Sequence, residues 1–432
     1  MSAQHPLFDR PLPRGWQVLA VDKVKANEPS SCVAGPFGSN ISSKYFVPEG
    51  VPVIRGNNLR DDLTRFVPTR FAFVSKEQAK QYKAQHVKPG DLVFTCWGTI
   101  GQVGLIPRNG PFPEYIISNK QLKLRPDSRV ADPLFLFYYF ASPQMIRHIR
   151  SISIGAAVPG INLGLLKSLP VALPPLPSQR DIASILSAYD DLIENNTRRI
   201  RILKEMAQAI YREWFVHFRF PGHKKVKLVN SPLGPIPEGW EARKLGDVCE
   251  IVMGQSPKSE FYNEQGEGLP FHQGVTDFGP HFPNDRVYCT VQNRIAEAGD
   301  ILFSVRAPVG RINVTLKRIV IGRGLCAIRN RQGNQRFTLH QLKERFAEED
   351  TMGGGTIFKA VTKEDMHGVG FLQPSGEIIQ SFEDRSHAMD KLIETLTQKN
   401  VNLRVTRDVL LPKLISGELD VSDLDIQMAG AG

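Results

Sequence analysis

Long apolar runs and paired metal-binding residues are both missing from this 432-residue chain. No run approaches the roughly 18 apolar residues that span a bilayer, and the amino terminus has no apolar signal-peptide core. The five cysteines form no CxxC pair and the ten histidines form no HExxH pattern, which argues against a disulfide framework or a zinc site. We therefore expect a cytoplasmic protein without a metal of its own.

Catalytic signatures are missing as well. The sequence has no GxxxxGK[ST] phosphate loop, no GxSxG nucleophile elbow and no Pro-Pro-aromatic tetrapeptide of an adenine-N6 methyltransferase. The glycine-rich stretch 98–104 does not open a helix with an acidic residue some 20 positions on, so it is a poor dinucleotide fingerprint. These absences predict a binding protein without catalytic residues or a cofactor in this chain.

Positive charge is in excess. The formal net charge is +10, which favours a polyanionic partner such as nucleic acid. Between residues 198 and 227, nine Lys and Arg stand against two Glu. This strip is either a solvated helix face with a linker or a surface that faces phosphates or a partner.

The sequence contains an internal repeat. Leu12-Pro-Arg-Gly-Trp16 returns as Ile236-Pro-Glu-Gly-Trp240, and both tryptophans are predicted to be core anchors. Gly90-Asp-Leu-Val-Phe94 returns as Gly299-Asp-Ile-Leu-Phe303, where Gly-Asp is predicted to form a turn that launches a strand. A duplicated architecture follows.

Each copy ends in a long helix with a narrow apolar seam, one over residues 178–220 and one over about 375–417. Such a seam needs a partner helix, and the simplest partner is the other helix in an antiparallel pair. The alternative is that each helix packs only on its own globular domain. The predicted seam residues, in which Asn196 sets the register, are Ile185, Tyr189, Leu192, Asn196, Leu203, Ile210, Met389, Ile393, Leu396, Leu403 and Leu410.

The segments 24–172 and 245–372 are rich in Gly, Pro, Val and Phe, with short strand-like runs. We predict an α+β fold with two mixed α+β domains, separated and joined by two long antiparallel coiled-coil helices in a pseudo-twofold repeat. The predicted order is a first domain (1–172), a central spacer helix (173–229), a second domain (230–372) and a distal helix with a tail (373–432).

These features resemble the specificity subunits of type I restriction-modification enzymes. The closing phrase Leu410-Leu-Pro-Lys-Leu-Ile-Ser-Gly-Glu-Leu419 and the loop Gly35-Pro-Phe-Gly-Ser39 strengthen the resemblance, although the second copy has Gly254-Gln-Ser-Pro-Lys258 instead. The resemblance implies that each domain reads one half of a split double-stranded DNA target. It also implies that the helices dock two modification (methyltransferase) subunits within a larger complex that contains restriction (endonuclease/translocase) subunits.

In that family the chemistry belongs to the partners. S-adenosylmethionine would bind the methyltransferase, and ATP and Mg would bind the endonuclease/translocase. A stand-alone sequence-specific DNA-binding protein without a methylase partner is the alternative.

Polar or guanidinium side chains near glycine-rich turns are the candidate DNA contacts, and each could instead be a turn residue without a base contact. They are Ser39, Asn40, Lys44, Arg55, Asn57, Asn58, Trp97, Thr99 and Lys120 in the first copy, and Gln255, Ser256, Lys258, His272, Gln273, Arg306, Arg311 and Arg323 in the second.

Overall fold

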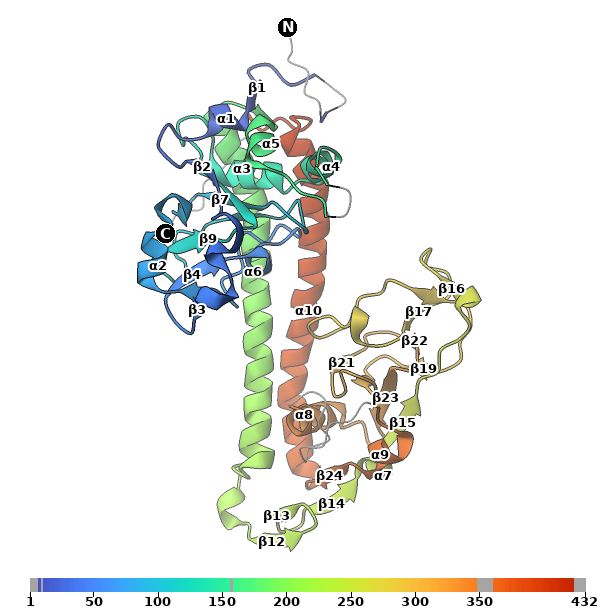
Figure 1. Ribbon diagram of the computed structural model, residues 1–432. Helices are drawn as coiled ribbons and strands as arrows, with labels where there is room; N and C mark the ends of the chain where they lie inside the picture. The colour runs from blue at the N-terminus through green and yellow to red at the C-terminus, as the bar shows by residue number, and fades with distance from the viewer. Residues whose placement is uncertain (1–6, 9–10, 156–157, 348–359, 423–432) are drawn as a thin grey trace. The chain divides into compact units, whose positions relative to one another are not determined.

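The computed structural model describes residues 7–8, 11–155, 158–347 and 360–422 (Figure 1). It contains two compact units, each built from one globular domain and half of each long helix. The first unit comprises residues 1–197 and 398–432, and the second comprises residues 198–397. Within the described ranges, no helix combines the length and the apolar character that crossing a bilayer requires.

The first unit holds two main sheets. The strand order β2-β10-β7-β8 makes an antiparallel sheet, and β3-β5-β4-β9-β6 makes a mixed sheet in which only β4 and β9 run parallel. A further antiparallel pair joins β1 to β11. The strands are β1 (Gln17–Ala20), β2 (Cys32–Ala34), β3 (Phe46–Val47), β4 (Val51–Ile54), β5 (Ala72–Val74), β6 (His86–Val87), β7 (Leu92–Thr95), β8 (Val103–Leu105), β9 (Tyr115–Ile117), β10 (Gln121–Leu124) and β11 (Pro170–Leu173).

The second unit repeats this topology strand for strand. Its sheets have the orders β15-β23-β20-β21 and β16-β18-β17-β22-β19, with β17 and β22 parallel, and β14 pairs with β24. A hairpin of β12 and β13 precedes them. The strands are β12 (Leu228–Ser231), β13 (Gly234–Pro237), β14 (Glu241–Lys244), β15 (Cys249–Met253), β16 (Tyr262–Asn263), β17 (Leu269–His272), β18 (Tyr288–Cys289), β19 (Ile295–Ala296), β20 (Ile301–Ser304), β21 (Ile312–Val314), β22 (Ile319–Ile321), β23 (Leu325–Asn330) and β24 (Gly370–Gln373). The predicted duplicated α+β fold is confirmed.

Two long helices and several short ones complete the chain. The long helices are α6 (Leu176–Tyr211), which continues into a π turn (Arg212–Val216), and α10 (Gly376–Ile415). Pro177 is tolerated in the first turn of α6 because the amide nitrogens there have no partner within the helix. The short α-helices are α1 (Val21–Val24), α2 (Lys76–Lys80), α3 (Pro133–Phe140), α4 (Pro143–Ser151), α5 (Leu163–Ser168), α7 (Leu245–Val248), α8 (Gln335–Arg345) and α9 (Lys363–Gly368). The 3-10 turns are Gly38–Ile41, Ser43–Tyr45, Gly56–Asn58, Lys83–Gln85, His223–Lys225, Ser259–Phe261 and Val275–Asp277.

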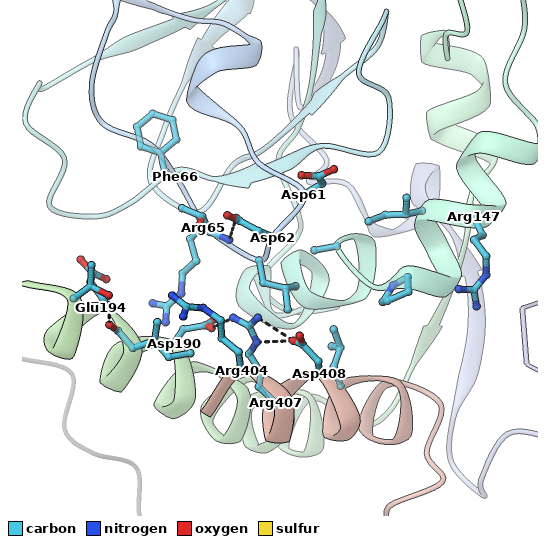
Figure 2. Close-up of a pocket in the computed structure, with 18 of the residues that line it drawn as sticks. Asp61, Asp62, Arg65, Phe66, Arg147, Asp190, Glu194, Arg404, Arg407 and Asp408 are labelled. Atoms are coloured by element: carbon cyan, nitrogen blue, oxygen red, sulfur yellow. Dashed lines mark hydrogen bonds and ion pairs between the residues drawn. The ribbon is translucent and has the colours of Figure 1, made fainter. Parts of the chain in front are cut away.

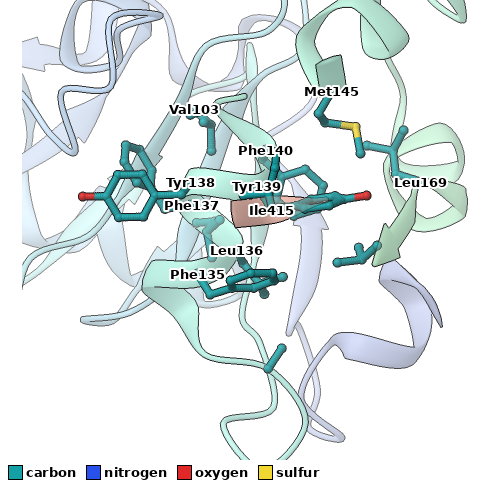
Figure 3. Close-up of a cluster of buried hydrophobic side chains, with 14 of the residues drawn as sticks. Val103, Phe135, Leu136, Phe137, Tyr138, Tyr139, Phe140, Met145, Leu169 and Ile415 are labelled. Atoms are coloured by element: carbon teal, nitrogen blue, oxygen red, sulfur yellow. The ribbon is translucent and has the colours of Figure 1, made fainter. Parts of the chain in front are cut away.

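Helix α3 lies at the centre of the first unit's core. Its amino terminus is capped by Asp132, whose Oδ1 accepts hydrogen bonds from the amides of Leu134 and Phe135, each at 2.9 Å. Residues 135–140 are all fully buried, so this helix is apolar on every side. Figure 3 shows its side chains beside Ile415, the last residue of α10. The carboxyl-terminal turn of α10 is thereby anchored in the first unit.

The second unit has an aromatic core to which Phe215 in the π turn after α6 and Phe382 of α10 contribute. The ring of Phe215 lies 4.8 Å from that of Phe337 and 5.3 Å from that of Phe382, measured between centroids. Trp240 is 6% exposed and its ring lies 5.0 Å from that of Phe220. The predicted anchoring role of Trp240 is confirmed, and Trp16 packs partly buried against the core of the first unit.

The helices pair directly within the first unit (Figure 1). Asn196 Nδ2 donates to Asn400 Oδ1 at 2.9 Å, and Arg407 Nη1 donates to Asp190 Oδ1 at 2.5 Å. Because the partner numbers fall on one helix as they rise on the other, the pair is antiparallel, as predicted. This pairing excludes the alternative in which each helix packs only on its own domain.

The buried line of each helix differs in part from the predicted seam. In α6, Leu192 is 52% exposed, and the buried residue is its neighbour Ile193. A straight α-helix has 3.6 residues per turn, so apolar residues spaced on average every 3.5 residues move away from the line of contact within a few turns. Of the other predicted residues, Asn196, Ile393 and Leu396 are buried, and Ile185, Tyr189, Leu203, Ile210, Met389, Leu403 and Leu410 are half-buried.

Candidate nucleic-acid interface

In the first unit the parallel pair β4 and β9 ends at one edge of its sheet. The amide of Ser118, just after β9, donates to the oxygen of Ile54, the last residue of β4, at 3.0 Å. Arg55 and Lys120 follow these strand ends in the sequence. Carboxyl ends of neighbouring parallel strands are a frequent place for binding residues because the loops that leave them converge.

Two further loops are tied to the same edge. The amide of Gly35 donates to the oxygen of Gln121 at 2.9 Å, and that of Cys96 donates to the oxygen of Lys120 at 2.9 Å. The side chain of Asn119 donates to the oxygen of Gly38 at 2.9 Å. Loops 35–41, 55–58, 96–102 and 118–120 therefore meet, and we call these loops the first rim.

Most candidate residues of the first copy are exposed on or beside this rim. Arg55, Asn57, Thr99, Lys120 and Asn40 are exposed, and the indole of Trp97 is 41% exposed. Lys44 lies on the following 3-10 turn with its ammonium 4.7 Å above the ring of Tyr45. The side chain of Ser39 lies outside the described part of the chain.

Asn58 is an exception. It is fully buried, its Oδ1 accepts from the amide of Arg55 at 3.0 Å, and its Nδ2 donates to the oxygens of Val67 and Thr69, each at 3.0 Å. Its hydrogen-bonding groups are thus engaged with backbone, and it holds the loop in place. We withdraw Asn58 from the candidate base contacts.

The second unit builds an equivalent edge from β17 and β22. The amide of Gly322 donates to the oxygen of His272 at 2.9 Å, and that of Gly324 to the oxygen of Gln273 at 3.0 Å. The amide of Gln255 donates to the oxygen of Ile321 at 3.0 Å, and that of Val305 to the oxygen of Gly324 at 2.9 Å. Loops 254–258, 273–274, 305–311 and 322–324 form the second rim.

The second rim carries more cations than the first. Its exposed candidates are Gln255, Lys258, Gln273, Arg306, Arg311 and Arg323. Ser256 is half-buried: its hydroxyl donates to Gln273 Oε1 at 2.7 Å and accepts from the amide of Arg323 at 3.2 Å. The Ser256 side chain therefore holds the Gln273 side chain and the backbone of Arg323 in place and does not point outward.

His272 is the second exception. It is fully buried and its Nε2 lies 3.1 Å from Asp285 Oδ1. Burial alone would raise the pKa of Asp285, but hydrogen bonds from His272 and Lys317 hold that pKa below its ordinary value. Since His272 is enclosed with a carboxylate partner, we withdraw it from the candidates as well.

An Asp–Arg ion pair, which the sequence analysis did not identify, lies at the end of β7 and β10 opposite the first rim and at the equivalent end of β20 and β23 in the second unit. Arg125 Nε and Nη2 donate to the two oxygens of Asp91, each at 2.7 Å, and Asp91 Oδ2 also accepts from the amide of Lys88 at 2.8 Å. In the second unit Arg329 donates to Asp300 at 2.8 and 2.7 Å. The Asp of each Gly-Asp motif thus closes its turn and clamps the adjacent strand. The sequence signal that could have identified this pair is the Arg that occurs at an equivalent position in both copies, Arg125 and Arg329.

A cavity in the first unit lies between loop 61–66, helix α4 and the helix pair (Figure 2). Its volume is about 840 Å³. Arg407 in its wall is held by Asp190 and Asp408. Arg147, Arg150 and Arg404 also line it, and among the described residues these three form no ion pair. Because Arg150 also lines a smaller hollow with Thr99, cationic side chains extend from the first rim toward the helices.

No resident metal site is evident in the described ranges. They contain no group of three or more His, Cys, Asp or Glu side chains that could hold an ion. All five cysteines are buried and free, and burial raises the pKa of Cys96 to about 11. Thiolates are the reactive form of cysteine, so the Cys96 thiol is poorly suited to nucleophilic chemistry.

Comparison with known proteins agrees with this architecture. A family model for the type I restriction modification DNA specificity domain matches residues 38–205 and again residues 237–403. Over 380 residues the chain is 30% identical to the provisionally named type I restriction enzyme MjaX specificity subunit of Methanocaldococcus jannaschii, covering 86% of this chain and 88% of that protein. It is 24% identical over 429 residues to the MjaIX specificity subunit of the same organism, covering 96% and 95%.

A solved structure shows the same fold. The type I restriction-modification system S subunit from M. genitalium aligns with a TM-score of 0.56 and 16% identity over 96% of this chain and 99% of that one. The two matches of the family model fall on the two copies of the strand topology. The chain therefore belongs to the specificity subunits of type I restriction-modification enzymes, the non-catalytic components that recognise DNA.

Proposed function

We propose that the chain binds a bipartite, asymmetric double-stranded DNA target, with one half-site read by each rim. The observation that carries this proposal is that one strand topology occurs twice with different side chains on its two rims. A repeated frame gives two similar docking surfaces. Different rim side chains give two different half-site sequences.

The rim side chains suit base edges in the major groove. Arg306, Arg311 and Arg323 offer guanidinium groups of the kind that bind guanine O6 and N7 in bidentate fashion. Gln255 and Gln273 offer amides of the kind that bind adenine N6 and N7. The first rim offers Arg55, Asn57 and the indole of Trp97. The second half-site is thus expected to depend more strongly on guanidinium contacts.

We propose that the exposed lysines and the arginines of the cavity contact DNA phosphates. Lys44 and Lys120 stand beside the first rim, and Arg147, Arg150 and Arg404 continue from it along the cavity. Such contacts position DNA without reading its sequence, and they make binding weaken steeply with salt. Substituting one of them should weaken all sequences about equally.

The helix pair is the proposed docking surface for two modification subunits. In the first unit, α10 exposes Val401, Val405 and Val409 at helical spacing, with exposures of 47, 60 and 54%. An apolar stripe on one face of an exposed helix suits a partner helix. Restriction subunits would complete the complex, with S-adenosylmethionine bound by the modification subunits and ATP and Mg bound by the restriction subunits.

Domain exchange tests the two-rim proposal. Replacing residues 24–172 with the corresponding segment of a related subunit should change one half-site only, as read from methylated adenines mapped across the host genome. A change in both half-sites would contradict separate readout. If the isolated chain bound its target at full affinity without a methyltransferase, the stand-alone alternative would be favoured.

Helix length offers a second test. Adding about one heptad to α6 and a matching heptad to α10 should alter the number of unread base pairs between the half-sites and leave their sequences unchanged. Unchanged spacing in the methylation map would contradict a spacer role for the helices.

A further inference from the structure

Phe37 is the most exposed large hydrophobic residue in the described part of the chain, with 92% of the residue exposed. It lies on the first rim, in the loop that contains the Gly-Pro-Phe-Gly-Ser sequence. We infer that the Phe37 ring makes an apolar contact with bases of the first half-site and is a specificity-determining residue of this subunit. This inference rests on the proposed DNA-reading role of the rims.

The loop around Phe37 is held at several points. On the amino-terminal side, the amide of Gly35 is bonded to Gln121, and a side chain at Gly35 would collide with the backbone oxygen of Ser118. On the carboxyl-terminal side, Gly38 adopts a φ of +60°, its oxygen accepts from Asn119, and the oxygen of Asn40 accepts from Tyr82 at 2.6 Å. The backbone thus presents the ring outward from fixed ends.

The residues around the ring are better suited to contact with nucleic acid than to packing in a protein core. Asn119, which holds Gly38, is followed directly by the exposed Lys120, and Arg55 leaves the neighbouring parallel strand. Exposed cations beside an exposed aromatic ring allow phosphate attraction and base contact on one surface. Proteins use apolar side chains against the thymine methyl group in the major groove and as wedges between base steps.

The second unit lacks this ring. The amide of Gly254 donates to the oxygen of Leu325 as the amide of Gly35 donates to that of Gln121, so Gly254 and Gly35 are equivalent positions. Two residues on, the equivalent of Phe37 is Ser256. The Ser256 hydroxyl is committed to Gln273 and to the backbone of Arg323. Apolar base contact from this position is therefore a property of the first half-site alone.

The test uses the assembled complex with its methyltransferase subunits and three variants. Phe37→Ala removes the ring, Phe37→Ser supplies the residue of the second unit, and Leu316→Ala is a matched control because Leu316 is 46% exposed in the second unit. Affinity is measured for the target, for DNA altered in the first half-site and for DNA altered in the second. Because Phe37 is almost fully exposed, its substitution should leave the thermal unfolding of the complex unchanged.

Both Phe37 variants should lose roughly 10-fold or more in affinity for the target and lose most discrimination at one position of the first half-site, with the second half-site read normally. Leu316→Ala should behave as the unsubstituted complex does. Wild-type affinity and discrimination in Phe37→Ala would overturn the inference, and so would an equal loss on every sequence. If the unsubstituted complex ignored both half-sites, the proposed function itself would fail instead.

Two DNA probes separate the modes of contact. Replacing thymine by deoxyuridine in the first half-site removes the methyl groups, so a methyl contact predicts the same loss in the wild type and no further loss in Phe37→Ala. The fluorescence of 2-aminopurine rises when the base is unstacked. If Phe37 acts as a wedge between base steps, 2-aminopurine placed at the contacted step should become more fluorescent on binding of the unsubstituted complex and not on binding of Phe37→Ala. Loss of affinity in the variants with neither response would contradict contact with the bases.

Discussion

The two units place different chemistry on equivalent positions of the helix pair. In the first unit, Asn196 and Asn400 form a buried hydrogen bond. The two long helices align at an offset of 200 residues, since Leu192-Ile-Glu194 matches Leu392-Ile-Glu394, so the equivalent positions in the second unit are Leu396 and Ile200. One half of the repeat thus has a polar pair where the other has two apolar residues. A buried amide pair accepts few alignments, so it specifies helix register at some cost in stability.

The sheets differ in the same manner. Lys123 in β10 is 1% exposed, and its ammonium donates to the oxygens of Ala84 at 2.6 Å and His86 at 2.8 Å. The equivalent residue in β23 is Ala327, because both lie opposite the second residue of β7 or β20. Yet the Asp–Arg pair occurs in both units. The repeat keeps the pair that shapes the turn and varies the groups around it.

The largest effect is expected from removing this shared pair. Asp91→Ala should destabilise the first unit by about 3–5 kcal/mol, because it leaves the mostly buried Arg125 without its bidentate partner and uncaps a turn. Asp300→Ala should cost less, about 1–2 kcal/mol, because Arg329 is 41% exposed and can be hydrated. Hydrogen exchange resolved by unit measures both values. Equal losses would show that exposure of the arginine does not decide the cost.

The polar helix pair gives the next effect. Asn400→Ile alone should cost about 1–3 kcal/mol, because it leaves the buried amide of Asn196 without its partner. Adding Asn196→Leu reproduces the residues of the second unit and should restore most of the lost stability. Denaturant unfolding of the single and double variants measures this coupling. A double variant no more stable than the single one would contradict it.

The next prediction concerns base recognition, and its effect should be similar to or smaller than that of the polar helix pair. Arg306 and Trp97 are equivalent, because each is the second residue after the last paired residue of its strand, Ser304 of β20 and Thr95 of β7. Arg306→Ala should lower discrimination in the second half-site by about 1–3 kcal/mol and leave the first unchanged. Trp97→Ala should do the reverse. Binding to DNA altered in either half-site distinguishes the two, and loss in both half-sites from one variant would contradict separate readout.

The smallest effect is a pH dependence that arises from Lys123 of the first unit. Burial lowers the pKa of Lys123 from 10.5 to about 8. Between these values the unfolded chain binds the proton and the folded chain does not, so this group makes stability rise with pH across that window, by at most about 1.4 kcal/mol per pH unit. Below pH 8 both states are protonated and the contribution is constant.

Lys123→Met isolates that contribution. The difference in unfolding free energy between the unsubstituted chain and this variant should grow in favour of the unsubstituted chain as pH rises from 8 toward 10.5. Ala327→Met serves as the matched control in the second unit and should add no such slope. A difference that stays flat with pH would show that Lys123 does not titrate in this window.

The sequence predicted the repeat, the paired helices and the family, because each depends on a periodic or local pattern. It misplaced part of the seam, since the choice between Leu192 and Ile193 depends on accumulated helical twist. It also selected Asn58 and His272 as base contacts, although both are buried. Whether a polar side chain faces outward depends on loop packing across distant segments, which residue type and a nearby glycine do not reveal.

The Asp–Arg pair that both units keep also bears on how such a subunit acquires a new target. Asp91 and Asp300 close turns at the ends of β7 and β20 that lie opposite the rim loops, so the pair that both units keep is separate from the side chains that the rims expose. Under the proposed two-rim readout, exposed rim residues can change without disturbing this pair, and a change on one rim leaves the other rim unaltered. A specificity subunit built in this way can alter one half of its target in a single step while the enzyme stays assembled.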